Sequence, residues 1–199
     1  MYPPASDDEI TGLVNYVDQQ LSAIRASAVG LTDEQARLRP CRSALSIGGL
    51  IKHATHGMRG AVERLANPDA PPRALDDHAF ATYMAGFALT DDETALGVIG
   101  EFDQIRAAYI AAFAATDPAA TTTEPPAPWA GVYDARPANA RYYLVHQIEE
   151  FARHAGHADI IREEIDAMAV PAIVLSQTGS SGNDYFQPYV PSPGTIGAP

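Results

Sequence analysis

The sequence has 199 residues, of which 46% are hydrophobic, and a formal net charge of −12. This length is that of one domain with at most an appendage. The excess of acidic residues and the lack of a basic run exclude nucleic acid and anionic membranes as main partners. The single cysteine, Cys41, excludes an intramolecular disulfide, and the lack of a signal-like start or an 18-residue apolar run predicts a soluble, cytoplasmic protein.

The first predicted helix spans about residues 7–28, with Ser6 as its N-cap. Its apolar residues recur at helical spacing, at Ile10, Leu13, Val14, Val17, Leu21 and Ile24. Thr32 and Gln35 form a capping box, which predicts a short second helix that ends at Pro40.

A longer helix is predicted over about residues 46–66, with His53 on or beside its apolar stripe. A lone histidine in such a place is more often a core residue than a ligand, but candidate partners on a later helix favour the ligand interpretation. Gly48 and Gly49 near the start of this helix would let another backbone or a ligand come close.

Residues 68–89 are predicted to be a loop or a short helical turn that lies over the helices. The next long helix is expected to begin at Thr90, with Glu93 completing a capping box. A loop rich in proline and threonine follows it, and Pro137 is expected to open the last long helix at or just before its first residue.

The last long helix includes residues 142–168 and carries the densest group of possible ligands. At about 100° per residue, one face holds four of its side chains, namely His146, Glu150, His154 and His157. Glu150 and His154 are four residues apart and can hold one ion together. Two turns, about 12 Å, separate His146 from His154, so these two cannot share an ion. The alternative is a solvated helix face that happens to contain histidines.

Four long amphipathic segments with little strand signal predict an all-α four-helix bundle over residues 1–168. Residues 169–199 read as an irregular Pro/Gly-rich tail with PAIVLSQ as one possible strand, and its apolar content predicts packing on the bundle or on a neighbouring subunit. Metal sites in bundles are built from facing helices, and His53, Glu150 and His154 would give a three-ligand set with an open position, the catalytic pattern.

Three stretches resemble the DinB/YfiT-like metal-binding four-helix-bundle superfamily: LTDEQARLRPCRSALSIGGLIKH, THGMRGAVERL and HQIEEFARHAGHADIIREEID. The resemblance covers about residues 7–168 and is to an actinobacterial branch designated a domain of unknown function. It implies an up-down-down-up bundle, a homodimer and the metal ligands His53, Glu150 and His154. Glutamate at position 150 is similar to the mycothiol-dependent maleylpyruvate isomerase branch.

The resemblance also implies a divalent metal, zinc before nickel or manganese, that activates a low-molecular-weight thiol such as mycothiol or bacillithiol. We therefore expect a thiol-dependent S-transferase or isomerase acting on a small-molecule electrophile. His157, where relatives often have glutamine, would lie beside the ligands or face the substrate. His146, His157 or Glu149 would transfer protons or orient the ligands.

Arg153 and Arg162 are candidates for holding a carboxylate of the thiol or substrate. We favour the alternative that each pairs with Glu149 or Glu163 on the helix surface. Cys41 is expected to be buried rather than nucleophilic. Two further classes of function fit the same ligands: a metal-dependent hydrolase, in which water attacks, and a non-catalytic bundle that binds a metal or a small ligand.

Overall fold

The computed structural model describes residues 6–67, 76–124, 126–127 and 131–198. Within these ranges the fold is mostly helical, as the sequence predicted, with seven helices and one small sheet that was not predicted. The long helices are α1 (Glu9–Ala26), α3 (Ile47–Ala66), α5 (Ala95–Ala114) and α6 (Ala140–Asp166). The shorter elements are α2 (Asp33–Arg37), α4 (Asp77–Ala85), α7 (Val170–Gln177), β1 (Thr121–Glu124) and β2 (Arg136–Asn139).

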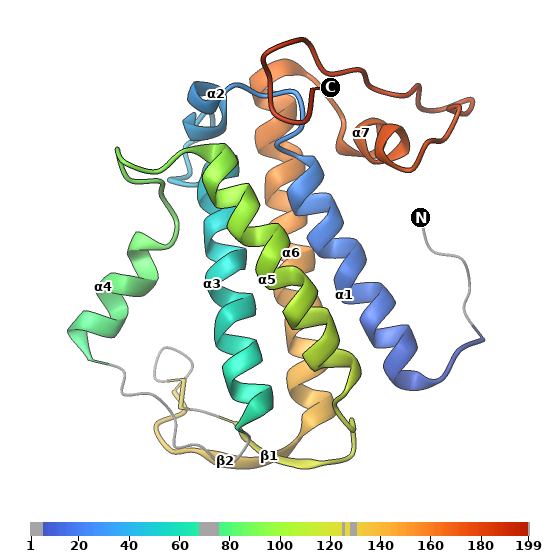
Figure 1. Cartoon of the computed structure of the whole chain (residues 1–199). Coiled ribbons are helices and arrows are strands. Elements are labelled where there is room, and N and C mark those ends of the chain that lie inside the picture. The colour runs from blue at the N-terminus through green and yellow to red at the C-terminus, as the bar shows by residue number, and fades with distance from the viewer. Residues whose placement is uncertain (1–5, 68–75, 125, 128–130, 199) are drawn as a thin grey trace.

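The four long helices lie alongside one another around a shared core (Figure 1). The chain runs in one direction in α1 and α6 and in the opposite direction in α3 and α5. The α3 helix packs most extensively on α5, and α1 packs most extensively on α6. Each long helix sends large apolar side chains into the core, among them Leu21, Leu50, Phe102 and Phe151. Within the described ranges, no helix is both long enough and apolar enough to span a membrane.

The start of α1 differs from the prediction, whereas the start of α2 confirms it. Asp8, not Ser6, caps α1, because its carboxylate accepts the Thr11 N–H at 2.9 Å. At α2, the Thr32 hydroxyl accepts the Gln35 N–H and the Gln35 side chain accepts the Thr32 N–H. This reciprocal pair is the predicted capping box.

The α5 helix begins later than predicted. Thr94, rather than Thr90, is its N-cap and accepts the Gly97 N–H at 3.1 Å. Glu93 does accept the Thr90 N–H, at 2.7 Å, but within a turn that precedes the helix. The same carboxylate oxygen also accepts a hydrogen bond from Lys52, at 2.8 Å, so the group expected to open α5 instead ties this turn to α3.

The connection between α5 and α6 contains an antiparallel two-stranded sheet where a loop was predicted. Threonine favours strands, and both strands of such a sheet are edges, where proline is tolerated. Pro137 therefore lies in β2, opposite Thr123, instead of opening α6. The N-cap of α6 is Asn139, whose side chain accepts the Tyr142 N–H at 3.2 Å.

Two segments are more helical than the sequence suggested. The α4 helix has nine residues, within a stretch predicted as a loop or a short turn; residues 68–75 of that stretch lie outside the described residues. The α7 helix replaces the possible strand PAIVLSQ. Val170 and Ile173 of α7 are three residues apart, so they share one helical face, and they pack on Ala26, the last residue of α1, and on Val29 just after it.

The remainder of the tail returns to the turn between α1 and α2. The Ile196 N–H donates to the Leu31 carbonyl at 2.9 Å, and the Gly30 N–H donates to the Ile196 carbonyl at 2.7 Å. Ile196 is buried in the main core. Gly30 has φ +84°, and a Cβ there would lie 1.9 Å from the Tyr189 hydroxyl, so both the backbone and the tail require glycine at this position.

Candidate metal centre

Three possible metal ligands converge between α3 and α6. His53 lies in the second turn of α3, and Glu150 and His154 lie one turn apart on α6. The Glu150 Oε1 atom is 3.2 Å from His154 Nε2 and 3.7 Å from His53 Nε2. One ligand atom from each residue lies within 4.8 Å of the other two. The structure thus brings together the three residues that the sequence singled out.

The electrostatics of the cluster keep the carboxylate ionised. Hydrogen bonding to His154, and secondarily to His53, holds the pKa of Glu150 well below its usual range. The two histidine side chains are about 10% exposed, whereas the Glu150 side chain is 33% exposed. Any molecule that approaches the cluster therefore does so from the side of the carboxylate.

The donor set fits a divalent cation such as zinc. Two imidazole nitrogens and one carboxylate are the ligands of open, catalytic zinc sites. Because His154 Nε2 faces Glu150, its Nδ1 atom points away from the cluster, where it is buried without a hydrogen-bond partner among the described residues. Metal-bound histidines usually receive their orientation from such a partner. The His154 ring also contacts the rings of His53 and His157.

An aromatic wall, formed by Tyr83 and Phe87, covers His53. The Phe87 ring stacks on the His53 ring, with centroids 4.0 Å apart and planes at 17°. Tyr83, at the end of α4, meets His53 edge-on at 5.6 Å and Phe87 at 5.3 Å. Burial, and then the charge of Glu150, raise the pKa of the Tyr83 phenol. Sequence reasoning missed both rings, and helical spacing could not have connected them, because Phe87 lies beyond the end of α4.

His157 lies beside the cluster, next to His154. Its ring centroid is 5.6 Å from that of His154, and its Nδ1 atom is buried without a partner in the described ranges. Burial, and then the neighbouring His154, lower the pKa of His157. The ring lines a cavity of about 200 Å³ together with Cys41 and Ser43. Cys41 is half-buried at this cavity, so the expectation of a fully buried thiol was wrong.

His146, Glu149 and Arg153 form a separate group on the exposed side of α6. His146 Nδ1 is 3.3 Å from one Glu149 oxygen, and Arg153 donates to the other at 2.8 Å. The Arg153 pairing is the surface alternative that the sequence favoured. These side chains contact one another instead of the cluster, and each is about half exposed or more.

Arg162 is fully buried, contrary to the expectation of a surface residue paired with Glu163. Its guanidinium donates twice to Asp166, at 2.8 Å each, and also to the carbonyls of Ser27 and Val29, at 2.7 and 2.6 Å. Every guanidinium nitrogen therefore has a protein acceptor. The side chain connects α6 to the end of α1 through these hydrogen bonds. Its role is therefore structural, and it does not bind a carboxylate of the thiol.

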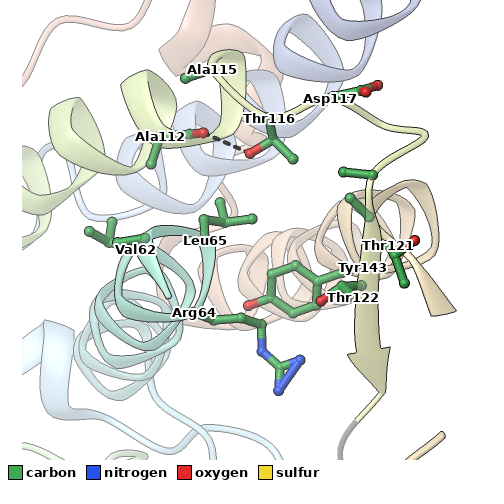
Figure 2. A pocket seen from close by; sticks show the side chains of 13 residues that line it. Val62, Arg64, Leu65, Ala112, Ala115, Thr116, Asp117, Thr121, Thr122 and Tyr143 are labelled. Atoms are coloured by element: carbon green, nitrogen blue, oxygen red, sulfur yellow. Dashed lines mark hydrogen bonds between the residues drawn. The ribbon is translucent and has the colours of Figure 1, made fainter. Parts of the chain in front are cut away.

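The larger of the two cavities described here lies away from the cluster. It has a volume of about 390 Å³ and lies between the last turns of α3 and α5, strand β1 and the first turns of α6. Figure 2 shows Val62, Leu65 and Tyr143 around it, with Arg64 beside the tyrosine ring. None of the three possible ligands lines it. The candidate site is therefore the cluster of donor atoms and not this cavity, because the size of a cavity alone indicates no chemistry.

The chain matches the model of a known protein family. A family model described as Mycothiol-S-transferase matches residues 12–167. The match spans most of α1 to the whole of α6 and includes the three possible ligands, but not α7 or the rest of the tail. Searches of curated proteins and of solved structures found no significant match.

Proposed function

Because the chain belongs to the mycothiol S-transferase family, we propose that it joins the sulfur of mycothiol to a small electrophile with the help of a bound divalent cation. This family is part of the DinB-like superfamily that the sequence resembles. The observation that carries the proposal is the convergence of His53, Glu150 and His154 from two helices, inside the matched region. Zinc is the cation that this donor set favours, with nickel and manganese as alternatives.

In this proposal the protein holds the cation through His53 Nε2, Glu150 Oε1 and His154 Nε2. A cation bound there acts as a Lewis acid and lowers the pKa of a thiol that reaches it. Glu150 supplies one negative charge and the neutral histidines supply none, so this ligand set leaves part of a divalent charge uncompensated. A cation held by these residues would therefore favour an anionic thiolate over a neutral thiol.

The proposed transfer conserves atoms and electrons. The thiol sulfur loses its proton and forms a bond to an electrophilic carbon; a leaving group departs with its bonding pair, or an unsaturated substrate takes up a proton in its place. Of the three expected proton-transfer groups, we favour His157, because its ring lies beside His154. His146 and Glu149 are engaged with each other on the exposed surface.

The surroundings support substrate entry from one side. Tyr83 and Phe87 cover His53 and exclude water there, whereas Glu150 remains partly exposed. We also infer that the four long helices form a DinB-like, up-down-down-up four-helix bundle within residues 1–168, that residues 169–199 cover one end of it, and that the chain forms a homodimer.

The test is a thiol-consumption assay with untagged, zinc-loaded protein. Mycothiol, bacillithiol and glutathione are each supplied with a halogenated and with an unsaturated electrophile, and both thiol loss and thioether formation are followed. We expect mycothiol to be consumed faster with zinc-loaded protein than with metal-free protein or with His154→Ala. If no thiol is consumed above the metal-free control and an ester or amide is hydrolysed instead, the hydrolase alternative replaces this proposal.

A further inference from the structure

We propose that Phe87 is the positioning residue of His53: its ring fixes the plane of the imidazole and thereby aims Nε2 at Glu150. This inference rests on the metal site of the proposed function. The two rings are nearly parallel at 4.0 Å, which is the closest ring contact that His53 makes. Because Nε2 lies in the ring plane, any rotation of the imidazole would move this atom relative to Glu150, 3.7 Å away.

A pair of glycines lets Phe87 reach this position. A Cβ on Gly49 would lie 2.0 Å from the Phe87 carbonyl oxygen, and a Cβ on Gly48 would lie 2.7 Å from a methyl group of Leu89. A larger residue at Gly49 would therefore push the Phe87 backbone away from α3, whereas a larger residue at Gly48 would displace the Leu89 side chain. Gly49 precedes His53 by four residues, about one helical turn. The Phe87 backbone that crosses Gly49 can therefore place its own side chain on the histidine ring.

The segment that carries Phe87, which we call the strap (residues 86–93), is also clamped to α3. Lys52, the only lysine in the sequence, is 9% exposed and donates to the Ala88 carbonyl at 3.1 Å and to Glu93 at 2.8 Å. Arg37 donates to the carbonyls of Thr90, at 3.0 Å, and Glu93. Lys52 directly precedes His53, so one stretch of α3 carries both the clamp and the ligand.

In this proposal, ring contacts orient the imidazole of His53. Histidine ligands are commonly oriented by an acceptor at the second ring nitrogen, and loss of that partner typically weakens metal binding about 10–100-fold. His53 instead has Phe87 on one ring face, with Tyr83 and His154 in edge contacts. Removal of the stacked ring would free the imidazole to rotate, while the three ligand residues would remain unchanged.

The experiment measures metal binding rather than turnover. Zinc affinity is determined by competition with a chromophoric chelator, and the coordination geometry is followed through the d–d absorption bands of the cobalt-loaded protein. Phe87→Ala is compared with Phe87→Tyr, which keeps the ring, and with two matched controls. Leu89→Ala removes strap packing at Gly48 without touching His53, and Phe80→Ala removes an aromatic ring that is 67% exposed on α4.

We expect Phe87→Ala to bind zinc about tenfold more weakly than the wild type and to alter the cobalt bands. Phe87→Tyr, Leu89→Ala and Phe80→Ala are each expected to keep both properties. The thermal midpoint of each metal-free variant shows whether a loss of affinity merely follows a loss of folding. Wild-type zinc affinity and cobalt bands in Phe87→Tyr, together with an unchanged thermal midpoint in Phe87→Ala, support the positioning role.

Three outcomes overturn the inference: unchanged zinc affinity and cobalt bands in Phe87→Ala, a Phe87→Tyr variant as defective as Phe87→Ala, or an equal loss in Leu89→Ala. If the wild type binds zinc no better than His154→Ala, the inference and the metal site both fail. If Phe87→Ala shows the expected defect but the wild type transfers no thiol, the proposed function fails and the positioning role stands.

Discussion

Glu150 Oε1 lies between two histidine nitrogens, 3.2 Å from His154 Nε2 on its own helix and 3.7 Å from His53 Nε2 on α3. Removal of either histidine leaves two ligands, too few to hold zinc tightly. We therefore predict that His154→Ala abolishes stoichiometric zinc binding, as measured by elemental analysis after dialysis. The matched control is Glu149→Ala, which removes the adjacent carboxylate from the exposed side of α6 and should leave zinc binding intact. Loss of zinc in both variants would point to general disruption of α6.

Zinc should also stabilise the folded protein. A ligand that binds only the native state contributes about 2.7 kcal/mol when its free concentration is 100 times its Kd. For a chain of this size, that corresponds to a rise of roughly 5–10 °C in the thermal midpoint. Scanning calorimetry with zinc and with a chelator measures the difference. His154→Ala should show no such rise, and an equal rise in that variant would place the zinc elsewhere.

Arg162 offers a test of stability independent of the metal. Arg162→Leu leaves two buried carbonyls without a donor and Asp166 without its ion-pair partner, so we expect a loss of about 3 kcal/mol or more. Urea unfolding measures it. Arg153→Leu on the same helix removes an exposed ion pair and should change the free energy of unfolding little. Equal effects of the two variants would contradict the structural role of the buried arginine.

The tail is predicted to contribute to stability or to assembly. Deletion of residues 169–199 uncovers the apolar patch at Ala26 and Val29 and removes Ile196 from the core. We expect the thermal midpoint to fall by at least about 5 °C, or the oligomeric state to change in size-exclusion chromatography. In the intact chain, Ile196→Ser should reproduce part of the loss, whereas Val190→Ser, at an 80% exposed position, should not. No effect of the deletion, with rapid proteolysis of the tail, would count against this role.

Asp33 should make stability depend on pH. Hydrogen bonding from the Ala95 N–H, at 2.5 Å, and then from Arg37 holds the pKa of Asp33 below its usual value. A carboxylate whose pKa is lower in the folded state adds stability above its unfolded pKa of about 3.9, and this is lost as the pH falls through the folded value. The contribution is at most about 1 kcal/mol, since the side chain is 38% exposed.

Urea unfolding of the wild type and of Asp33→Asn between pH 2.5 and 6 tests this prediction; the range spans the carboxylate pKa. The wild type should be the more stable protein at pH 6, and the difference should shrink at the acidic end. A difference that stays constant over the whole range would show that the charge of Asp33 does not contribute.

The convergence of the three possible ligands could be expected from the sequence, because helical spacing pairs two of them and the family resemblance adds a histidine on another helix. Glu150 and His154 share a face by their separation of four residues, and His53 lies on the stripe that α3 buries. Phe87 and Tyr83 could not be predicted in the same way, because their position depends on the approach of a distant segment to α3. The glycines that permit this approach were visible in the sequence, but what would occupy the space was not.

The errors in the predicted fold also arise where contacts between distant segments decide the structure. PAIVLSQ is a short apolar run, which periodicity alone cannot assign to helix or strand. Pro137 is compatible with a helix start and with an edge strand, and the pairing with β1 decides between them. The burial of Arg162 depends on the carbonyls of Ser27 and Val29, which no local pattern connects to α6.

The pairing of Gly30 with Ile196 has a consequence for biosynthesis. A ribosome releases the first helix and its following turn long before it makes Ile196, because chains emerge from the N-terminus. Until then the Gly30 N–H and the Leu31 carbonyl lack the partners that they have in the finished fold, and the apolar surface near Val29 stays uncovered. The contacts that complete this end of the fold therefore form only once nearly the whole chain has been made.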